Sequence, residues 1–593
     1  MNKKEKEFEI LGPQAILHVR EKICTSIREL LQSPVFEIMV EHYWRMLFSR
    51  QSPLCAPFRE QCKGPDDSAK IVELLRVLSG IPLDQAAGML PWAAHLTEPA
   101  NPRLLHEFVE GFYNFWRSYD RYMILHSEPG PSSLDQRPYR AFNETLENLN
   151  HIVRALYRDI CENITGDHPR IYRQVSAGCD VGLIATAKTG VLPPPYAAVL
   201  DNIPFIRQAM INPPLIIDPP MNKRTGQFQK IEEDPLAGAR IERERYLCFP
   251  LQVGPLTIFV YFHNLFMGLG CALSNLFEVA NDEQVANGPD AIYLFGQPAE
   301  QLERFGQLPT VFYDDPQSGL LVASVPAEER FAYFGYLKKM ILTLHNIIMM
   351  KRGRMPYHGA MVRLVLRGDK TATFLIIGDT ATGKSESLEA LRLVGRDSIE
   401  EIRIIADDMG SLEIDTAGCL VGYGTEIGAF VRLDDLQQGY AFEQMDRAIF
   451  MSPHRTNARV VLPVTTLEDI LEGHRVDYML YANNYEQVDD YHPLIHRFHN
   501  PSEALTVFRE GAAMAKGTTT TTGLGHSYFA NIFGPPQYRD LHDGLAESIF
   551  KQAFKSGTFV GQVRTRLGIE GYETTGPQEV ARALLKLFEH EAS

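Results

Sequence analysis

The chain has 593 residues, of which 45% are hydrophobic and 22% charged, and its formal net charge at pH 7 is −16. This length exceeds what one hydrophobic core usually holds, so we expect two or three domains of an ordinary soluble globular protein. The negative charge argues against a nucleic acid or an anionic membrane as partner, because those surfaces repel a chain of the same sign.

Cysteine spacing and apolar runs bear on the cellular compartment. Eight cysteines are scattered without a C-x-x-C pair, which predicts neither a zinc knuckle nor a disulfide framework. The first residues mix acid and base and lack the apolar core of a signal peptide. The long apolar run at 256–273 contains His263, Asn264 and two glycines, so we interpret it as a buried strand and a core segment rather than a membrane span. These features predict a cytoplasmic enzyme.

Residues 1–165 are expected to form a helical N-terminal region. Apolar residues recur three and four positions apart at 26–31, 71–78 and 104–112, which is the period of one helix face. No pattern that carries chemistry stands out here, so packing or a dimer surface is the favoured interpretation.

Residues 166–330 are expected to form a β-rich lobe that binds substrate. Proline and glycine become denser, and strand-like runs occur at 246–253, 256–261 and 319–324. Several cations near turn-rich sequence could clamp a carboxylate, although each alone is more typical of a solvated surface charge. They are Arg170, Arg173, Arg207, Lys223 and Arg224.

Residues 331–593 contain a phosphate-binding loop. Positions 378–385 match the Walker A pattern G-x-x-x-x-G-K-[ST], with an apolar strand pattern at 373–377 before it and a helical pattern at 387–393 after it. Loop amides face an anion, Lys384 adds charge at the terminal phosphates, and Ser385 can hold a divalent cation. We expect ATP or GTP to bind here; a glycine turn that binds nothing is the alternative. The loop residues are Gly378, Asp379, Thr380, Ala381, Thr382, Gly383, Lys384 and Ser385.

A second strand pattern, at 402–406, ends in the paired carboxylates Asp407 and Asp408, 24 residues past Lys384. A carboxylate at the end of a strand can reach a cation that bridges nucleotide phosphates, whereas a helix cap or turn pair is the alternative. Further strands are expected at 458–463 and 476–481, which makes this region an α/β core. Residues 518–522, five threonines, are expected to form a polar loop, either an active-site lid or a connection.

Four features in order resemble the ATP-type phosphoenolpyruvate carboxykinases. Tyr333 stands six residues before Lys339, His358 follows that lysine by 19 residues, and the phosphate loop and the paired aspartates come next. The segment 456–463, with Arg459, resembles the family segment that touches the transferring phosphoryl group. The segment 564–569, with Arg566, resembles more weakly the one that lines the adenine pocket, and 513–517 and 528–535 resemble later core strands.

The loop itself is closer to HPr kinase/phosphorylase, a protein serine kinase that belongs to another branch of the same fold. Ala381 stands where both families usually have glycine, so we expect a different loop backbone there. The distance from Lys384 to Asp408 exceeds that of both families, which implies an insertion around 395–401. The arginine-serine-proline-lysine-aspartate-lysine substrate segment of the carboxykinases is not found in residues 1–330.

The resemblance covers about residues 331–575 and implies an α/β fold with a carboxykinase-like P-loop core. It implies Mg²⁺ near Ser385 and Mn²⁺ among Lys339, His358 and Asp408. The implied catalytic residues are Lys339, His358, Lys384, Asp408 and Arg459. The implied metal ligands are Lys339, His358, Ser385, Asp407 and Asp408. Arg566 is implied to bind nucleotide together with the loop, and Tyr333 to bind substrate.

The implied reaction converts oxaloacetate and a nucleoside triphosphate into phosphoenolpyruvate, CO₂ and the diphosphate, with small molecules as the only partners. The alternative is an HPr-kinase-like enzyme that phosphorylates a hydroxyl, with Asp407 or Asp408 as general base. Lys339 favours the first, because a hydroxyl kinase needs no lysine metal ligand. A nucleotide-sensing protein without turnover is a third alternative. The donor (ATP, GTP or pyrophosphate) and the oligomeric state stay open.

Overall fold

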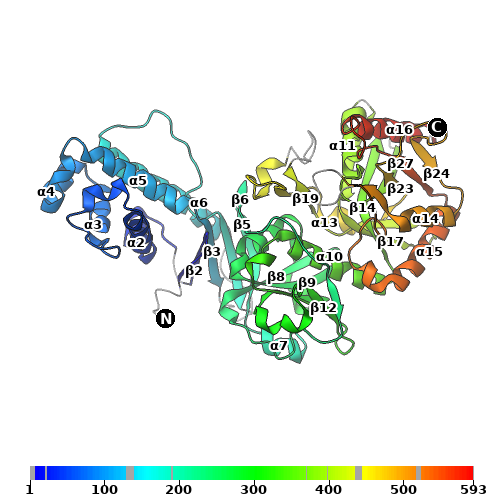
Figure 1. Cartoon of the computed structure of the whole chain (residues 1–593), viewed down its shortest axis with the longest axis horizontal. Helices are drawn as coiled ribbons and strands as arrows, with labels where there is room; N and C mark the ends of the chain where they lie inside the picture. Colours follow the sequence, from blue (N-terminus) through cyan, green and yellow to red (C-terminus); the bar gives the residue numbers. More distant parts are fainter. Residues whose placement is uncertain are drawn as a thin grey trace. The chain divides into compact units, whose positions relative to one another are not determined.

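The computed structural model describes residues 7–20, 23–127, 139–187, 191–368, 370–396, 398–433, 444–515 and 523–591 (Figure 1). The protein is a mixed α/β protein with several sheets. Two compact units divide the chain: Met1–Ala187 with Pro204–Asn212, and Lys188–Ile203 with Pro213–Ser593.

The first unit contains the expected helical stretch. Its helices are α1 (Ile27–Gln32), α2 (Pro34–Ser49), α3 (Ala69–Leu78), α4 (Leu83–Met89), α5 (Asn101–Arg117) and α6 (Tyr139–Thr165). The helices predicted at 26–31, 71–78 and 104–112 are confirmed as α1, α3 and α5. Ser26 and Ser33 cap α1 and α2 by accepting hydrogen bonds from the backbone amides of Glu29 and Phe36. Apolar faces of α2, α3, α5 and α6 meet in one core around Trp44 and Phe108.

The same unit also holds strands that the helical period did not predict. They run in the order β1 (Phe8–Leu11), β2 (Gln14–Val19), β3 (Asp120–Ser127), β4 (Val181–Ala187) and β5 (Pro204–Ile211). The pairs β2–β3 and β3–β4 are parallel, and β4–β5 is antiparallel. Short apolar runs such as β3, whose middle residues are buried, carry no alternation that would mark them as strands.

The second unit begins with a sheet in the order β8 (Tyr246–Val253), β9 (Leu256–His263), β11 (Ala291–Gln297), β13 (Leu321–Pro326), β12 (Val311–Asp314) and β7 (Gln229–Ile231). The strands predicted at 246–253, 256–261 and 319–324 are therefore confirmed as β8, β9 and β13. The apolar run at 256–273 forms β9 and then α8 (Met267–Ala272), both buried. In the described part of the chain, no helix is long and apolar enough to cross a membrane.

A second sheet of this unit carries the phosphate-loop motif. Its order is β22 (His474–Arg475), β18 (Leu420–Gly424), β17 (Met409–Ile414), β14 (Met355–Leu366), β15 (Lys370–Ile377), β23 (Tyr478–Asn483), β27 (Phe559–Arg564) and β24 (Ile495–Arg497), and β16 (Ile399–Ala406) pairs with β14. The pairs β15–β23 and β23–β27 are parallel. The expected strands at 373–377, 402–406 and 476–481 fall in β15, β16 and β23.

Helices bury the apolar surface of this sheet. α11 (Lys384–Val394) and α16 (Thr575–Glu591) pack together, and Leu391 and Leu584 share a core with Phe374 of the sheet (Figure 1). The remaining long helices are α10 (Phe334–Lys351), α14 (Pro501–Glu510) and α15 (Arg539–Ser556). A small sheet runs in the order β19 (Gly428–Arg432), β21 (Arg459–Pro463), β20 (Ile449–Met451) and β6 (Leu215–Ile217), and β21 is the strand expected at 458–463.

One expected strand is wrong. The segment 528–535 forms turns, because Phe529, Ala530 and Asn531 have φ angles of 44°, 58° and 61°, which no β-strand can accommodate. The strand expected within 513–517 is in part correct, since β25 (Ala512–Met514) pairs with β26 (Leu524–His526). The threonine run at 518–522 lies outside the described residues.

Candidate active site

The phosphate loop connects β15 to α11, as the motif requires. Gly383 precedes the first residue of α11 with φ of 88°, a left-handed conformation that favours glycine. A Cβ atom there would lie 2.8 Å from Thr565 Cβ, and one at Gly378 would lie 2.4 Å from Thr382 Oγ1. Close packing therefore requires both glycines, and at Gly383 the backbone conformation requires glycine as well.

Side chains from neighbouring strands hold the loop in place. Thr565 Oγ1 donates a hydrogen bond to the carbonyl of Thr382 (2.6 Å), and Asn484 Nδ2 donates one to the carbonyl of Ala381 (3.1 Å). Ala381 has φ of 64°, so this alanine adopts the left-handed conformation that a glycine would adopt without strain. This backbone conformation is strained for an alanine, and the expected difference from the loops of the two families stays a prediction.

A cavity of about 220 Å³ lies beside the loop. Five elements supply its predicted residues: the start of α10, β14, the phosphate loop with α11, the end of β16 and the start of β21. The predicted residues that line it are Tyr333, Lys339, His358, Thr380, Ala381, Lys384, Ser385, Asp407, Asp408 and Arg459.

Arg566 is not among the residues around this cavity. Its guanidinium forms an ion pair with Glu579 of α16 and lies 4.1 Å from the centroid of the Tyr572 ring. The structure therefore gives this arginine a partner within the fold and does not bring it together with the other predicted site residues.

Asp408 is the centre of a charged network. His358 Nε2 lies 3.0 Å from Asp408 Oδ1, and Lys338 Nζ lies 2.7 Å from Asp408 Oδ2. Burial opposes ionisation of this carboxyl, but the Lys338 ammonium and the His358 hydrogen bond outweigh it and hold the pKa of Asp408 well below its usual range. Asp408 is therefore an anion at neutral pH.

Lys338 and Glu426 belong to this network, although no sequence pattern pointed to either of them. The side chain of Lys338 is 1% exposed, and its Nζ lies 3.2 Å from Glu426 Oε1, an ion pair without an aligned hydrogen bond. Burial lowers the pKa of Lys338, but Asp408 and Glu426 outweigh it and raise that pKa. Burial raises the pKa of Glu426 to about 8, although Lys338 acts against this rise. Glu426 comes two residues after β18 and belongs to no recognisable sequence motif. The spacing to His358 that resembles the carboxykinases selects Lys339, the neighbour of Lys338.

Asp407 and Ser385 face each other across the end of the phosphate loop. Ser385 Oγ donates a hydrogen bond to Asp407 Oδ1 at 3.0 Å. Burial raises the pKa of Asp407 to about 6, while the charge of Lys384 and the serine hydrogen bond act against this rise. The two oxygens form a pair of hard donors in the wall of the cavity.

Lys339 lies in the cavity wall with little hydration. Burial, the charge of Arg224 and lesser charges lower the pKa of Lys339 to about 8, although Asp408 acts against this fall. Its Nζ lies 4.7 Å from the centroid of the Phe533 ring. A lysine with this pKa loses its proton far more readily than an exposed one, which a metal ligand requires.

Arg459 presents a second cation to the cavity. Its guanidinium lies 5.4 Å from the centroid of the Phe430 ring, and within the described part of the chain its buried Nε has no hydrogen-bond partner. A buried, unpaired N–H is costly unless a ligand accepts from it.

No protein-family model matches the chain, and no curated protein matches it at a significant level. Any assignment of function therefore rests on the residues of the cavity.

Proposed function

We propose that the second unit is a nucleotide- and divalent-metal-dependent phosphoryl-transfer enzyme with a carboxykinase-like fold. The reaction proposed first is that of phosphoenolpyruvate carboxykinase, which converts oxaloacetate and a nucleoside triphosphate into phosphoenolpyruvate, CO₂ and the diphosphate. The observation that carries the proposal is the convergence of Lys339, His358 and Asp408 with the phosphate loop around one small cavity.

The positive charge of Lys384 and Arg459 in the cavity suits a nucleoside triphosphate. The amides at the start of α11 and the ammonium of Lys384 would contact its terminal phosphates. Arg459 approaches the same cavity from β21 with an unpaired N–H. Lys384 and Arg459 would spread the charge that develops on the transferring phosphoryl group.

The donor atoms at the site suit two divalent cations. Ser385 Oγ and Asp407 Oδ1 are the hard oxygen donors that Mg²⁺ prefers. Lys339, His358 and Asp408 offer the mixed nitrogen and oxygen donors that suit Mn²⁺. His358 Nδ1 bonds to the carbonyl of Ala530 and so carries a proton, which leaves Nε2 facing a carboxylate oxygen. That nitrogen lies 3.0 Å from Asp408 Oδ1 and is the ring atom that would bind a cation together with this carboxylate.

When bound, these cations would supply charge stabilisation at the phosphate oxygens and at the substrate oxygen. The protein's own part is to hold the reactants: Tyr333 lies at the cavity wall where a small oxo acid would bind, and Phe533 and Phe430 exclude water from it.

A second candidate function is a kinase that phosphorylates a hydroxyl. The observation that favours it is the pKa of Asp407, raised to about 6 by burial, since a carboxylate tuned toward neutrality serves as a general base. In that case Lys339 would contact phosphate rather than metal.

The test is a coupled assay on the purified full chain with Mn²⁺ and Mg²⁺, which offers oxaloacetate with ATP, GTP or pyrophosphate and detects phosphoenolpyruvate. Product that disappears in Lys339→Met would support the carboxykinase reaction and would identify the donor. Bound nucleotide without phosphoenolpyruvate would reject that reaction and favour the hydroxyl kinase. The absence of both nucleotide binding and product would reject the proposal as a whole.

A further inference from the structure

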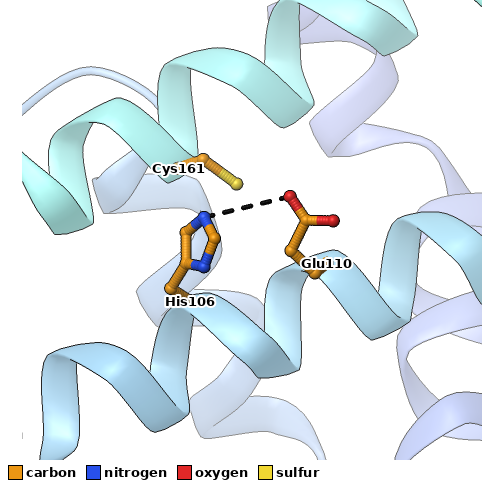
Figure 2. Close-up of side chains that lie close together, drawn as sticks. All are labelled: His106, Glu110 and Cys161. Atoms are coloured by element: carbon orange, nitrogen blue, oxygen red, sulfur yellow. Dashed lines mark ion pairs between the residues drawn. The ribbon is translucent and has the colours of Figure 1, made fainter. Parts of the chain in front are cut away.

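Three potential metal ligands meet between two packed helices of the first unit. His106 and Glu110 lie one turn apart on α5, and Cys161 faces them from α6 (Figure 2). One ligand atom from each residue lies within 4.8 Å of the other two. No other group of three or more His, Cys, Asp or Glu residues in the described ranges meets this criterion.

The spacing of the ligands suits a single ion. His106 Nε2 lies 3.9 Å from Glu110 Oε1, an i,i+4 pair on one helix face. Zinc takes nitrogen and oxygen at about 2.0–2.2 Å and sulfur at about 2.3 Å, so ligand atoms of a tetrahedral site lie roughly 3.3–3.8 Å apart. The distance between His106 Nε2 and Glu110 Oε1 is close to this range, and the other ligand-atom distances are at most 4.8 Å.

Burial leaves one side of the group open. Cys161 is 7% exposed, whereas the side chains of His106 and Glu110 are 34% and 39% exposed. Three protein ligands with one face toward solvent are typical of zinc sites that keep a water as the fourth ligand. The opening also gives an ion its path of entry.

A neighbouring tyrosine orients the carboxylate. The hydroxyl of Tyr157 donates a hydrogen bond to Glu110 Oε1, and the Tyr157 ring stacks on Tyr113 with centroids 4.0 Å apart. Such outer contacts fix the direction of a ligand and are a regular part of metal sites. Oε2 and the second lone pair of Oε1 stay available for an ion.

We propose that His106, Glu110 and Cys161 bind one divalent cation of the zinc type. A thiolate with an imidazole selects zinc over Mg²⁺ and Ca²⁺, which prefer oxygen ligands. The bound ion would link α5 to α6 and so stabilise the helical core of the first unit. This site is independent of the proposed phosphoryl transfer, because it uses none of the residues that line the cavity beside the phosphate loop.

The experiment titrates the metal-free full chain with Co²⁺ and records the near-ultraviolet charge-transfer band of a cobalt thiolate. We expect one equivalent of Co²⁺ to produce the band and Zn²⁺ to abolish it. Co²⁺ bound beside the phosphate loop would give no such band, because no cysteine lines that cavity in the described part of the chain. The absence of the band at saturating Co²⁺ would overturn the proposal.

Matched variants identify the ligand. Cys161→Ser should lose the band, whereas Cys62→Ser, which changes a buried cysteine of the same core, should keep it. His106→Gln, at a half-exposed position that leaves the core intact, should weaken Co²⁺ binding, and Tyr157→Phe should weaken it about 10–100-fold. A band that survives in Cys161→Ser, or full affinity in His106→Gln, would contradict the assignment.

Discussion

Lys338 Nζ lies 2.7 Å from Asp408 Oδ2 and is almost fully buried, although the sequence spacing pointed to its neighbour Lys339. One ammonium thus neutralises Asp408 and approaches Glu426 as well. Lys339 is left without a carboxylate at ion-pair distance among the described residues, and its pKa is lowered. The two adjacent lysines therefore have different roles: Lys338 keeps Asp408 charged, and Lys339 faces the cavity.

Lys338→Met should strongly destabilise the second unit. The change leaves Asp408 and Glu426 without their cation, and breaking a buried ion pair typically costs about 3–5 kcal/mol. Urea denaturation followed by circular dichroism measures the loss. Lys70→Met, which removes an exposed pair with Glu73, is the control and should cost less than about 1 kcal/mol. Equal effects of the two variants would contradict the role of Lys338.

Lys339→Met should lower kcat for phosphoenolpyruvate formation by about 10²–10³, the usual cost of losing one group that stabilises charge. Nucleotide affinity should change little, because Lys339 lies on α10 and not on the phosphate loop. Lys384→Met should instead abolish turnover and weaken nucleotide binding. Steady-state kinetics with a fluorescent-nucleotide titration separates the two, and unchanged kcat in Lys339→Met would count against the site as assigned.

Ala381→Gly should leave nucleotide binding intact and raise stability by no more than about 1 kcal/mol. Glycine relieves the strain of φ at 64°, which costs about 1–2 kcal/mol for alanine, but it also makes the unfolded chain more flexible.

Gly383→Ala, two positions along, is the contrasting variant. Its new Cβ would lie 2.8 Å from Thr565 Cβ, so we expect at least about a tenfold loss of nucleotide affinity, which corresponds to roughly 1.4 kcal/mol. Titration with a fluorescent nucleotide measures both variants. Similar affinities would show that the loop tolerates a side chain at either position.

The first unit should lose stability between pH 6.5 and pH 4. His18 Nδ1 and His126 Nε2 lie 3.0 Å apart, and burial lowers the pKa of each ring from 6.5 to about 4. Because the unfolded chain binds more protons in this range, stability is fully present above pH 6.5 and falls as the pH drops toward 4. Protonation of one of the two rings alone lowers the free energy of unfolding by roughly 3 kcal/mol, because its pKa falls from 6.5 to about 4.

Tryptophan fluorescence reports this loss selectively. The chain has three tryptophans, Trp44, Trp92 and Trp116, and all lie in the first unit. Urea denaturation followed by this signal should show a midpoint that falls with pH, and the double variant His18→Gln with His126→Gln should flatten the dependence. The same pH slope in both proteins would contradict the role of the histidine pair.

The sequence predicted the local elements of the second unit well. The strand, loop and helix around Lys384 follow from contiguous residues, because a buried apolar run, two glycines and an amphipathic helix each have a short-range signature. The strand predicted at 528–535 is wrong, because the left-handed backbone angles of this segment depend on surrounding contacts and not on its own composition.

By itself, the sequence determined the glycine loop at 378–385, the strand before it, the helix after it and the mixed α/β class, since these depend on neighbouring residues. Only the tertiary structure decided which charges meet. It pairs Lys338 with Asp408, 70 positions away, and Arg566 with Glu579. It also brings Cys161 close to His106. Such contacts come from the packing of distant elements, and no local pattern encodes the distance between two side chains that the chain brings together only when it folds.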